Sequence, residues 1–157
     1  MRINVIAVGT RLPAWQQDGF RDYARRLPKE CAMVLTEIPA ATRVKSKSTP
    51  QSIRKESDRV LAAVARNDYV VALDQPGVQY ASEDLAALLD TWLAQGRDLA
   101  MLVGGADGLS DACLGRADLR WSLSDLTLPH GLARVVLAEQ LYRAWTILRG
   151  HPYHRGE

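Results

Sequence analysis

Residues 99–108 read Leu-Ala-Met-Leu-Val-Gly-Gly-Ala-Asp-Gly, a short apolar run that stops at a glycine-rich segment. Five apolar residues bounded by glycine are typical of a strand that is buried on both faces of a parallel sheet. A second run, Tyr-Val-Val-Ala-Leu at 69–73, has the same character and ends at Asp74-Gln75-Pro76-Gly77. Because a helical pattern separates the two runs, the sequence predicts an α/β fold.

The rest of the chain continues this alternation of strand and helix. Further strands are expected at 3–8, 33–38 and near 120–123, and helices at 13–27, 50–66, 82–95, after Ser110 and at 131–148. Thr49 and Ser82 are predicted to cap helices, and Gly96 to end one. Residues 40–49 have no period and predict a loop. No linker interrupts the pattern, which indicates one domain, 1–157, with a mostly parallel sheet covered by helices on both faces.

Composition excludes several classes of protein. Among 157 residues, 47% are hydrophobic and 24% charged, which is ordinary for a globular chain and argues against a disordered or fibrous one. The net charge is +2, but residues 1–66 hold 13 basic and 6 acidic side chains, whereas residues 67–130 hold 3 and 10. A surface that binds a polyanion is therefore expected to use the first and last parts of the chain.

Metal, disulfide and membrane functions have little support in the sequence. Cys31 and Cys113 lie far apart, which excludes a disulfide scaffold and a thiolate zinc site. His151 and His154 invite a metal interpretation, but Pro152 interrupts their alignment and no carboxylate or thiolate lies nearby, so no metal is expected. The N-terminal apolar stretch is too short for a signal peptide or a membrane span, which favours a cytoplasmic location without a membrane partner.

Ligands of parallel sheets bind at the carboxyl ends of the strands, which directs attention to the loops after Leu73, Val103 and Leu123. The segment 104–108 either cradles a cofactor with backbone amides or is only a tight turn; it matches neither a dinucleotide fingerprint nor a P-loop. The segment 122–131 is apolar and rich in hydroxyl groups. It either lines an apolar slot for a purine-like ring or is a buried linker.

The last helix and the residues after it raise two further questions. Apolar residues of 131–148 occupy nearly every side of the helix, which predicts cover from a second subunit in a homodimer. The following residues, His151 to Arg155, either form a donor-rich tail that orders over a substrate or a frayed terminus. Covalent hydrolysis has little support because no nucleophile elbow is present.

The segment at 123–144, Leu-Ser-Asp-Leu-Thr-Leu-Pro-His-Gly-Leu-Ala-Arg-Val-Val-Leu-Ala-Glu-Gln-Leu-Tyr-Arg-Ala, is followed by His-Pro-Tyr-His at 151–154. Together these segments closely resemble the bacterial ribosomal RNA large subunit methyltransferase H family, within the SPOUT class of knotted methyltransferases. The resemblance covers the whole chain. One departure is Gly156, which precedes the terminal Glu157.

The resemblance implies transfer of a methyl group from S-adenosyl-L-methionine to N3 of a pseudouridine in 23S rRNA, on the assembled 70S ribosome. It also implies a C-terminal trefoil knot, which is rare and which no periodicity reveals, and a homodimer. Carried over residue by residue, the expected cofactor contacts are Leu73, Gly104, Leu123, Ser124, Asp125, Leu126, Thr127 and Leu128. The catalytic tail would be Tyr153, His154 and Arg155.

Within that tail, we expect His154 to handle the imide proton and Arg155 to stabilise the anion or bind phosphate. The basic side chains expected to contact RNA are Arg134, Arg143, Arg43, Lys45 and Lys47, with Arg11, Arg25 and Arg26. For Arg143 the alternative is an ion pair with Glu139 one helical turn away.

Two other functions compete with this interpretation. A non-catalytic module that only binds rRNA would keep the sheet but would not need the three loops. A SPOUT methyltransferase with another target, such as tRNA, would keep the fold and the cofactor.

Overall fold

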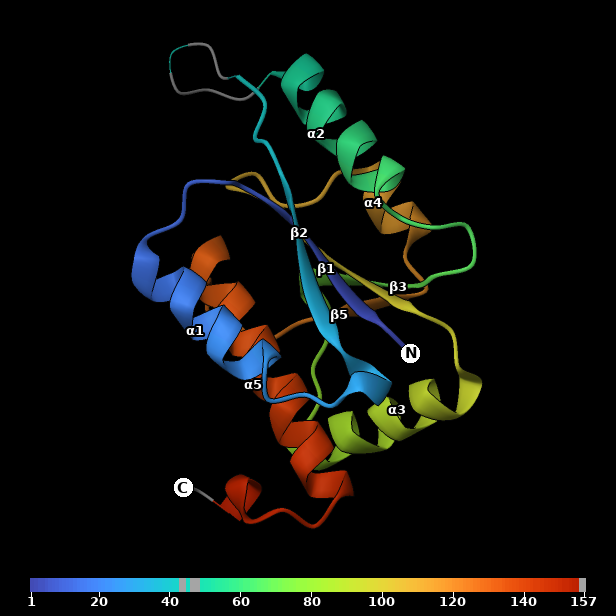
Figure 1. Cartoon of the computed structure of the whole chain (residues 1–157). Coiled ribbons are helices and arrows are strands. Elements are labelled where there is room, and N and C mark those ends of the chain that lie inside the picture. Colours follow the sequence, from blue (N-terminus) through green and yellow to red (C-terminus); the bar gives the residue numbers. More distant parts are fainter. Residues whose placement is uncertain (43–44, 46–48, 156–157) are drawn as a thin grey trace.

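The computed structural model describes residues 1–42, 45 and 49–155, and its centre is a five-stranded parallel sheet (Figure 1). The strand order is β2-β1-β4-β3-β5, and every neighbouring pair is parallel. The strands are β1 (Ile3–Val8), β2 (Met33–Ile38), β3 (Tyr69–Val78), β4 (Leu99–Val103) and β5 (Leu119–Trp121). This confirms the predicted parallel α/β sheet.

Helices cover both faces of the sheet (Figure 1). They are α1 (Ala14–Ala24), α2 (Pro50–Ala62), α3 (Ser82–Gln95), α4 (Asp111–Arg116) and α5 (His130–Leu148), with 3-10 turns η1 (Lys29–Cys31) and η2 (Pro152–Arg155). Alternate residues of β1 divide between two apolar clusters: Val5 and Ala7 pack with α1, α3 and α5, whereas Ile6 and Val8 pack with α2 and α4. This two-residue period is the reason that a strand with apolar residues on both faces serves both layers.

The third strand is longer than the sequence predicts. It continues past Leu73 to Val78, and both of these residues oppose Trp121 of β5, so the register breaks between them. The fifth strand ends earlier than expected, at Trp121, where the Ser122 amide donates to the Val78 carbonyl at 2.9 Å. The extra residues bulge at the carboxyl edge of the sheet, which places Asp74 and Gln75 there.

Helix termini follow some of the predicted signals. Thr49 caps α2 by accepting from the Ser52 amide at 3.0 Å, and Gly96 ends α3 in a left-handed conformation with φ +70°. The prediction for Ser82 is wrong. Ala81 precedes the helix, and the Ser82 hydroxyl, inside the first turn, donates instead to Oε1 of Gln140. Helices α1 and α2 also end several residues before the predicted positions.

The last helix packs between α1 and α3 of the same chain. Leu137 and Leu141 are completely buried by these neighbours, while Leu132, Val136 and Ile147 remain partly exposed. Part of the apolar surface that seemed to need a second subunit is therefore covered within the chain.

Candidate functional site

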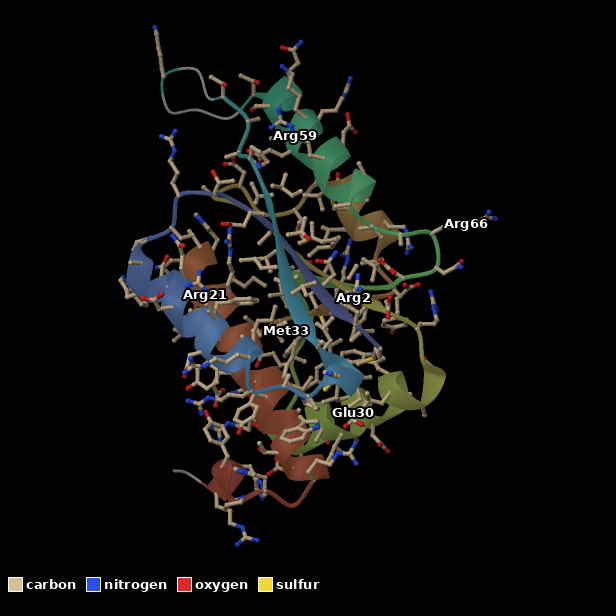
Figure 2. The ribbon with its side chains drawn as sticks, viewed as in Figure 1. Arg2, Arg21, Glu30, Met33, Arg59 and Arg66 are labelled. Carbon is tan, nitrogen blue, oxygen red and sulfur yellow. The ribbon has the colours of Figure 1, made fainter. Side chains whose placement is uncertain are left out.

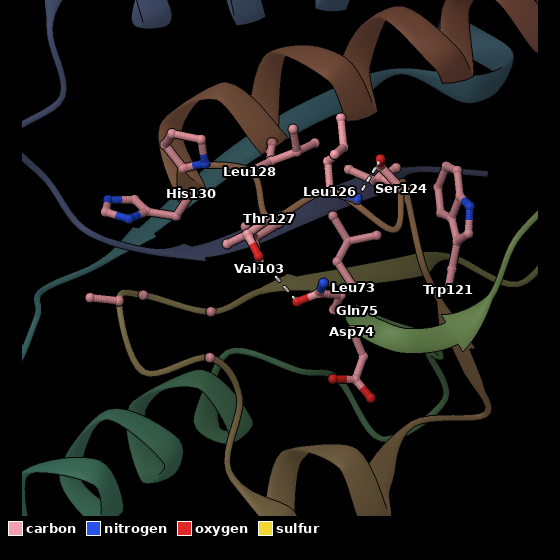
Figure 3. Close-up of a pocket in the computed structure, with 17 residues that line it drawn as sticks. Leu73, Asp74, Gln75, Val103, Trp121, Ser124, Leu126, Thr127, Leu128 and His130 are labelled. Carbon is pink, nitrogen blue, oxygen red and sulfur yellow. Dashed lines mark hydrogen bonds between the residues drawn. The ribbon is translucent and has the colours of Figure 1, made fainter.

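A cavity of about 470 Å³ opens at the carboxyl end of the sheet (Figure 3). Three segments line it: the end of β3 from Leu73 to Gln75, the loop after β4, and the segment between β5 and α5. The predicted convergence of the three strand-end loops is thus confirmed. Of the eight residues expected to contact a cofactor, all but Asp125 line this cavity.

One wall of the cavity is apolar, and a few polar side chains, among them Gln75 and Thr127, also line it. Leu123, Leu126 and Leu128 come from the segment before α5, and Leu126 is 74% exposed. Such a mixture of apolar wall and a few directed polar groups is typical of sites for small organic ligands. The exposure of Leu126 argues against the alternative that this segment is only a buried linker.

Glutamines of the β3 edge hold the leucine-rich segment in place. The Gln75 amide nitrogen donates to the Asp125 carbonyl at 2.9 Å, and the Gln79 amide donates to the Asp125 carboxylate at 2.6 Å. The Thr127 hydroxyl donates to Oε1 of Gln75 at 3.5 Å (Figure 3). These contacts explain why Asp125 turns away from the cavity. Sequence reasoning missed both glutamines because their partners lie about fifty residues further along the chain.

The glycine-rich loop after β4 is both a tight turn and a wall of the cavity. The Gly108 amide donates to the Gly105 carbonyl at 3.0 Å, which closes the turn. A Cβ on Gly104 would lie only 2.5 Å from the Gly108 carbonyl carbon, so no larger residue fits there. The two interpretations of this segment are therefore compatible.

His130 lines the cavity at the start of α5. Burial lowers the pKa of its imidazole, and the positive charge of Arg134 lowers it further. The side chain is therefore a neutral imidazole at neutral pH.

Arg134 is only 1% exposed, which corrects the expectation that it contacts RNA. Its guanidinium donates to the Glu37 carboxylate at 3.0 Å and to the carbonyls of Val8 and Gly9 at 3.1 and 2.8 Å. Gly9 has φ +117°, which only glycine adopts readily, and it presents its carbonyl to the guanidinium. A group held in this way ties α5 to the ends of β1 and β2 and is not available to a phosphate.

The tail forms the turn η2, which follows the C-terminal end of α5 and packs against this helix. The Tyr153 hydroxyl donates to Glu139 at 3.0 Å and lies 3.3 Å from the Tyr23 hydroxyl, and its ring packs edge-on against Tyr142 with centroids 4.8 Å apart. Burial raises the pKa of Tyr153, and the hydrogen bonds to Tyr23 and Glu139 raise it further. Up to Tyr153, the end of the described chain is therefore docked on the fold, which contradicts the alternative of a frayed terminus.

The other two tail residues are less constrained. Nδ1 of His154 is buried without a hydrogen-bond partner in the part of the chain that the structure describes, and Arg155 is exposed. Arg155 is therefore free to engage groups outside this chain, whereas Nδ1 of His154 is not accessible to solvent in this structure.

Arg143 has the partner that its position in the helix allows. Its Nε and Nη2 donate to Glu139 at 2.9 and 2.6 Å, and its guanidinium lies 5.0 Å from the centre of the Tyr153 ring. The alternative of an ion pair one turn away is thus confirmed. Arg143 supports the docked tail more directly than it offers a free charge to RNA.

The remaining cations are spread over several elements. Arg43 and Lys47 lie outside the described residues, whereas Lys45 and Arg11 are exposed. Arg25 and Arg26 pair with Asp22 on α1. Figure 2 shows Arg21, Arg59 and Arg66 on different sides of the molecule. No one patch therefore collects the basic side chains among the residues described.

The cavity and the tail lie at opposite ends of α5. His130 is the first residue of this helix of 19 residues, and Tyr153 follows its last turn. A helix of this length spans about 28 Å. Within one chain, the structure therefore does not bring the expected cofactor contacts and the expected catalytic residues together.

Over residues 1–42, 45 and 49–155, no group of three or more His, Cys, Asp and Glu side chains is arranged to hold a metal ion. Within the same residues, no helix has the length and apolar character needed to cross a bilayer.

Comparisons with known proteins bear on the whole chain. A family model described as "Predicted SPOUT methyltransferase" matches residues 1–154. The ribosomal RNA large subunit methyltransferase H of Thioalkalivibrio sulfidiphilus is 54% identical over 155 residues, which cover 99% of each chain. The protein of the same name from Methylococcus capsulatus is 51% identical, covering 99% of this chain and 100% of its own.

Solved structures support the fold at lower sequence identity. A methylase family protein from Neisseria gonorrhoeae aligns with a TM-score of 0.52 at 18% identity, covering 89% of this chain and 81% of the other. One from Haemophilus influenzae has the same TM-score at 12% identity, covering 94% and 66%. At these identities the likeness concerns the fold alone.

Proposed function

This chain belongs to the SPOUT methyltransferase family, and from that premise we propose that it is an rRNA methyltransferase of the large ribosomal subunit. The finer proposal is transfer of a methyl group from S-adenosyl-L-methionine to N3 of a pseudouridine in 23S rRNA, on the assembled 70S ribosome. The observation that carries it is the cavity, because one of its walls belongs to the segment 123–144 on which the family resemblance rests. A single cytoplasmic domain with a C-terminal knot is part of the same proposal.

The residues of the cavity fit the proposed cofactor. Its volume suits a ligand of nucleoside size, the leucine wall suits an adenine ring, and a buried oxygen of Asp74 has no partner in the described chain. We assign Leu73, Gly104 and the segment 123–128 to hold it. When bound, S-adenosyl-L-methionine supplies an electrophilic methyl group on a sulfonium.

The protein has to align the target nitrogen with the methyl group and to remove one proton from that nitrogen. The target imide nitrogen has no in-plane lone pair until its proton leaves, so a base or a cation near the developing anion accelerates attack by about 10²–10⁴-fold. We assign the proton to His154 and the anion or a nearby phosphate to Arg155. Arg155 is exposed, and Nδ1 of His154 has no hydrogen-bond partner among the described residues, which supports this assignment.

The separation along α5 supports a homodimer in which each site is composite. If the tail of one chain serves the cavity of its partner, the two sets of residues meet without unwinding the helix. The partly exposed Leu132, Val136 and Ile147 supply apolar surface for that contact. Mixing a variant truncated after Pro152 with a Gly104→Val variant tests this arrangement. Mixed dimers should recover part of the activity that each variant alone has lost.

The main experiment measures transfer of labelled methyl from S-adenosyl-L-methionine to ribosomes from a strain that lacks this modification. Intact 70S ribosomes, separated subunits and tRNA are assayed side by side, and labelled nucleosides are identified by mass spectrometry. Label at N3 of a pseudouridine only in 70S 23S rRNA is the expected result. Label in tRNA would retain the fold and the cofactor but reject the target. A folded protein that transfers no label and binds no cofactor would favour the rRNA-binding module.

A further inference from the structure

Asp74 is an acidic residue of the cavity to which neither the family resemblance nor the proposed mechanism gives a role. It follows Leu73 in the bulged part of β3 and lines the cavity. Its Oδ2 atom is buried and makes no hydrogen bond within the described chain. In Figure 3 its carboxylate lies apart from Leu128 and His130, on the opposite side of Leu73 and Gln75 from the apolar wall.

The described residues that line the cavity with Asp74 supply no compensating charge. Among the described residues that line the cavity, Asp74 is the only acid, and none is a lysine or an arginine. His130 does not compensate because burial and Arg134 lower its pKa and keep the imidazole neutral. A buried carboxylate oxygen without a partner is costly, and proteins keep such a group where a ligand supplies what is missing.

The proposed reaction changes the charge of the cofactor. The methyl donor carries a positive sulfonium, a positive ammonium and a negative carboxylate, which leaves one net positive charge. When the carbon–sulfur bond breaks and the methyl group leaves, the sulfur becomes a neutral thioether and the net charge falls to zero. A fixed negative charge in the cavity therefore distinguishes the two states by electrostatics alone.

We propose that Asp74 is a charge-selecting residue of the cofactor site, which favours the sulfonium form over the demethylated product and so promotes product release. This inference rests on the proposed function, because it requires S-adenosyl-L-methionine to occupy the cavity. It adds a ligand-binding role for a side chain, where the expected contacts supply an apolar wall and backbone groups.

The test measures binding to the full-length protein by calorimetry. Four ligands are compared: S-adenosyl-L-methionine, S-adenosylhomocysteine, sinefungin, which carries an amine in place of the methylated sulfonium, and the uncharged methylthioadenosine. In Asp74→Asn the affinity for the first and third should fall about tenfold, while the affinity for the other two changes less than twofold. Asp74→Glu keeps the charge and should restore most of the selectivity. Asp90→Asn removes the same charge from the exposed face of α3 and should alter none of the four affinities.

A second measurement, thermal unfolding without ligand, does not depend on binding. Because Oδ2 has no partner, Asp74→Asn should raise the unfolding temperature by about 2–4 °C or leave it unchanged. A drop of several degrees would mean that the carboxylate stabilises the fold, and would overturn the proposal.

The other outcomes separate this inference from the proposed function. If Asp74→Asn weakens S-adenosyl-L-methionine and S-adenosylhomocysteine equally, Asp74 binds a group that both share, and charge selection is wrong. If it weakens neither, Asp74 does not face the ligand. If the wild-type protein binds none of the four ligands, the proposed function itself fails.

Discussion

Each end of α5 has a buried or partly buried arginine, but the two arginines have different partners and different structural roles. At the N-terminal end, Arg134 directs its guanidinium inward to the ends of β1 and β2, which leaves the neighbouring surface open as a cavity. At the C-terminal end, Glu139, Arg143 and Tyr153 contact one another and fill the space between the helix and the tail. Arg134 therefore stabilises the backbone next to the cavity, whereas Arg143 stabilises the docked tail. The presence of an arginine on this helix does not by itself indicate which of these roles it has.

The largest effect is expected from removing the tail. A chain truncated after Pro152 should lose methyl transfer by about 100-fold or more, because it lacks the groups assigned to the proton and the anion. Its affinity for S-adenosyl-L-methionine should stay within about threefold of wild type, since the truncation leaves every residue assigned to hold the cofactor in place. Single-turnover methylation and calorimetry measure the two quantities. Turnover at the wild-type rate would reject the assignment of His154 and Arg155.

The second largest effect concerns stability at the cavity end. Arg134→Met leaves two backbone carbonyls and a carboxylate without their donor, and should lower the free energy of unfolding by about 2–4 kcal/mol. Urea denaturation measures the loss. Arg149→Met is the matched control, because its partner Glu30 and its own side chain are about half exposed; it should cost under about 1 kcal/mol. Equal losses in both variants would mean that burial of Arg134 adds nothing.

A smaller effect is expected at the tail cluster. Glu139→Gln keeps the shape of the side chain but removes the charge that accepts from both Arg143 and Tyr153. We expect kcat for methyl transfer to fall about tenfold, with KM for the cofactor unchanged, because the tail loses its fixed position. Tyr153→Phe should reproduce part of this loss. A rise in KM without a change in kcat would show that Glu139 acts on the cavity instead.

The smallest effect is a pH dependence at the cavity end. Because burial lowers the pKa of His130 in the folded chain, the unfolded chain binds a proton first as the pH falls through about 6.5. Its contribution to stability is therefore complete above that pH and is lost below it. The charged groups on the elements around His130 are Arg134, which forms an ion pair with Glu37, and the carboxylate of Asp74. Between pH 7.5 and pH 5.5, wild type should lose up to about 1 kcal/mol more than His130→Gln. If the stability of wild type and of His130→Gln changed equally with pH, protonation of His130 would not contribute to the pH dependence of stability.

How far the sequence predicts the molecule depends on the distance between interacting residues. The strands at β1, β2 and β4 are predictable because short segments rich in apolar residues, each followed by a glycine or a proline, define them locally. The bulge of β3 is not, since the register break involves Trp121 more than forty residues away. The burial of Arg134 is hidden for the same reason: its partners, Val8, Gly9 and Glu37, lie about a hundred residues earlier.

The candidate site also has features that the sequence predicts and features that only the structure reveals. The three loops could be predicted from the rule for strand ends, and the cavity confirms their convergence. The separation of the tail from the cavity could not, because a resemblance between sequences lists residues without saying which end of a helix they occupy. The rule for strand ends points to the loop that begins with Asp74, but only packing shows that one oxygen of this residue has no partner.

The position of β1 between β2 and β4 has a consequence for synthesis of the chain. Ile3 pairs with Met33 on one side but with Leu99 on the other, so the first strand keeps an open edge until nearly a hundred residues have been translated. An unpaired apolar edge is a site for aggregation, and closing such distant pairs is slow. The clamp of Arg134 on Val8 and Gly9 forms later still. The nascent chain therefore remains incomplete, and in need of protection, until almost its whole length has left the ribosome.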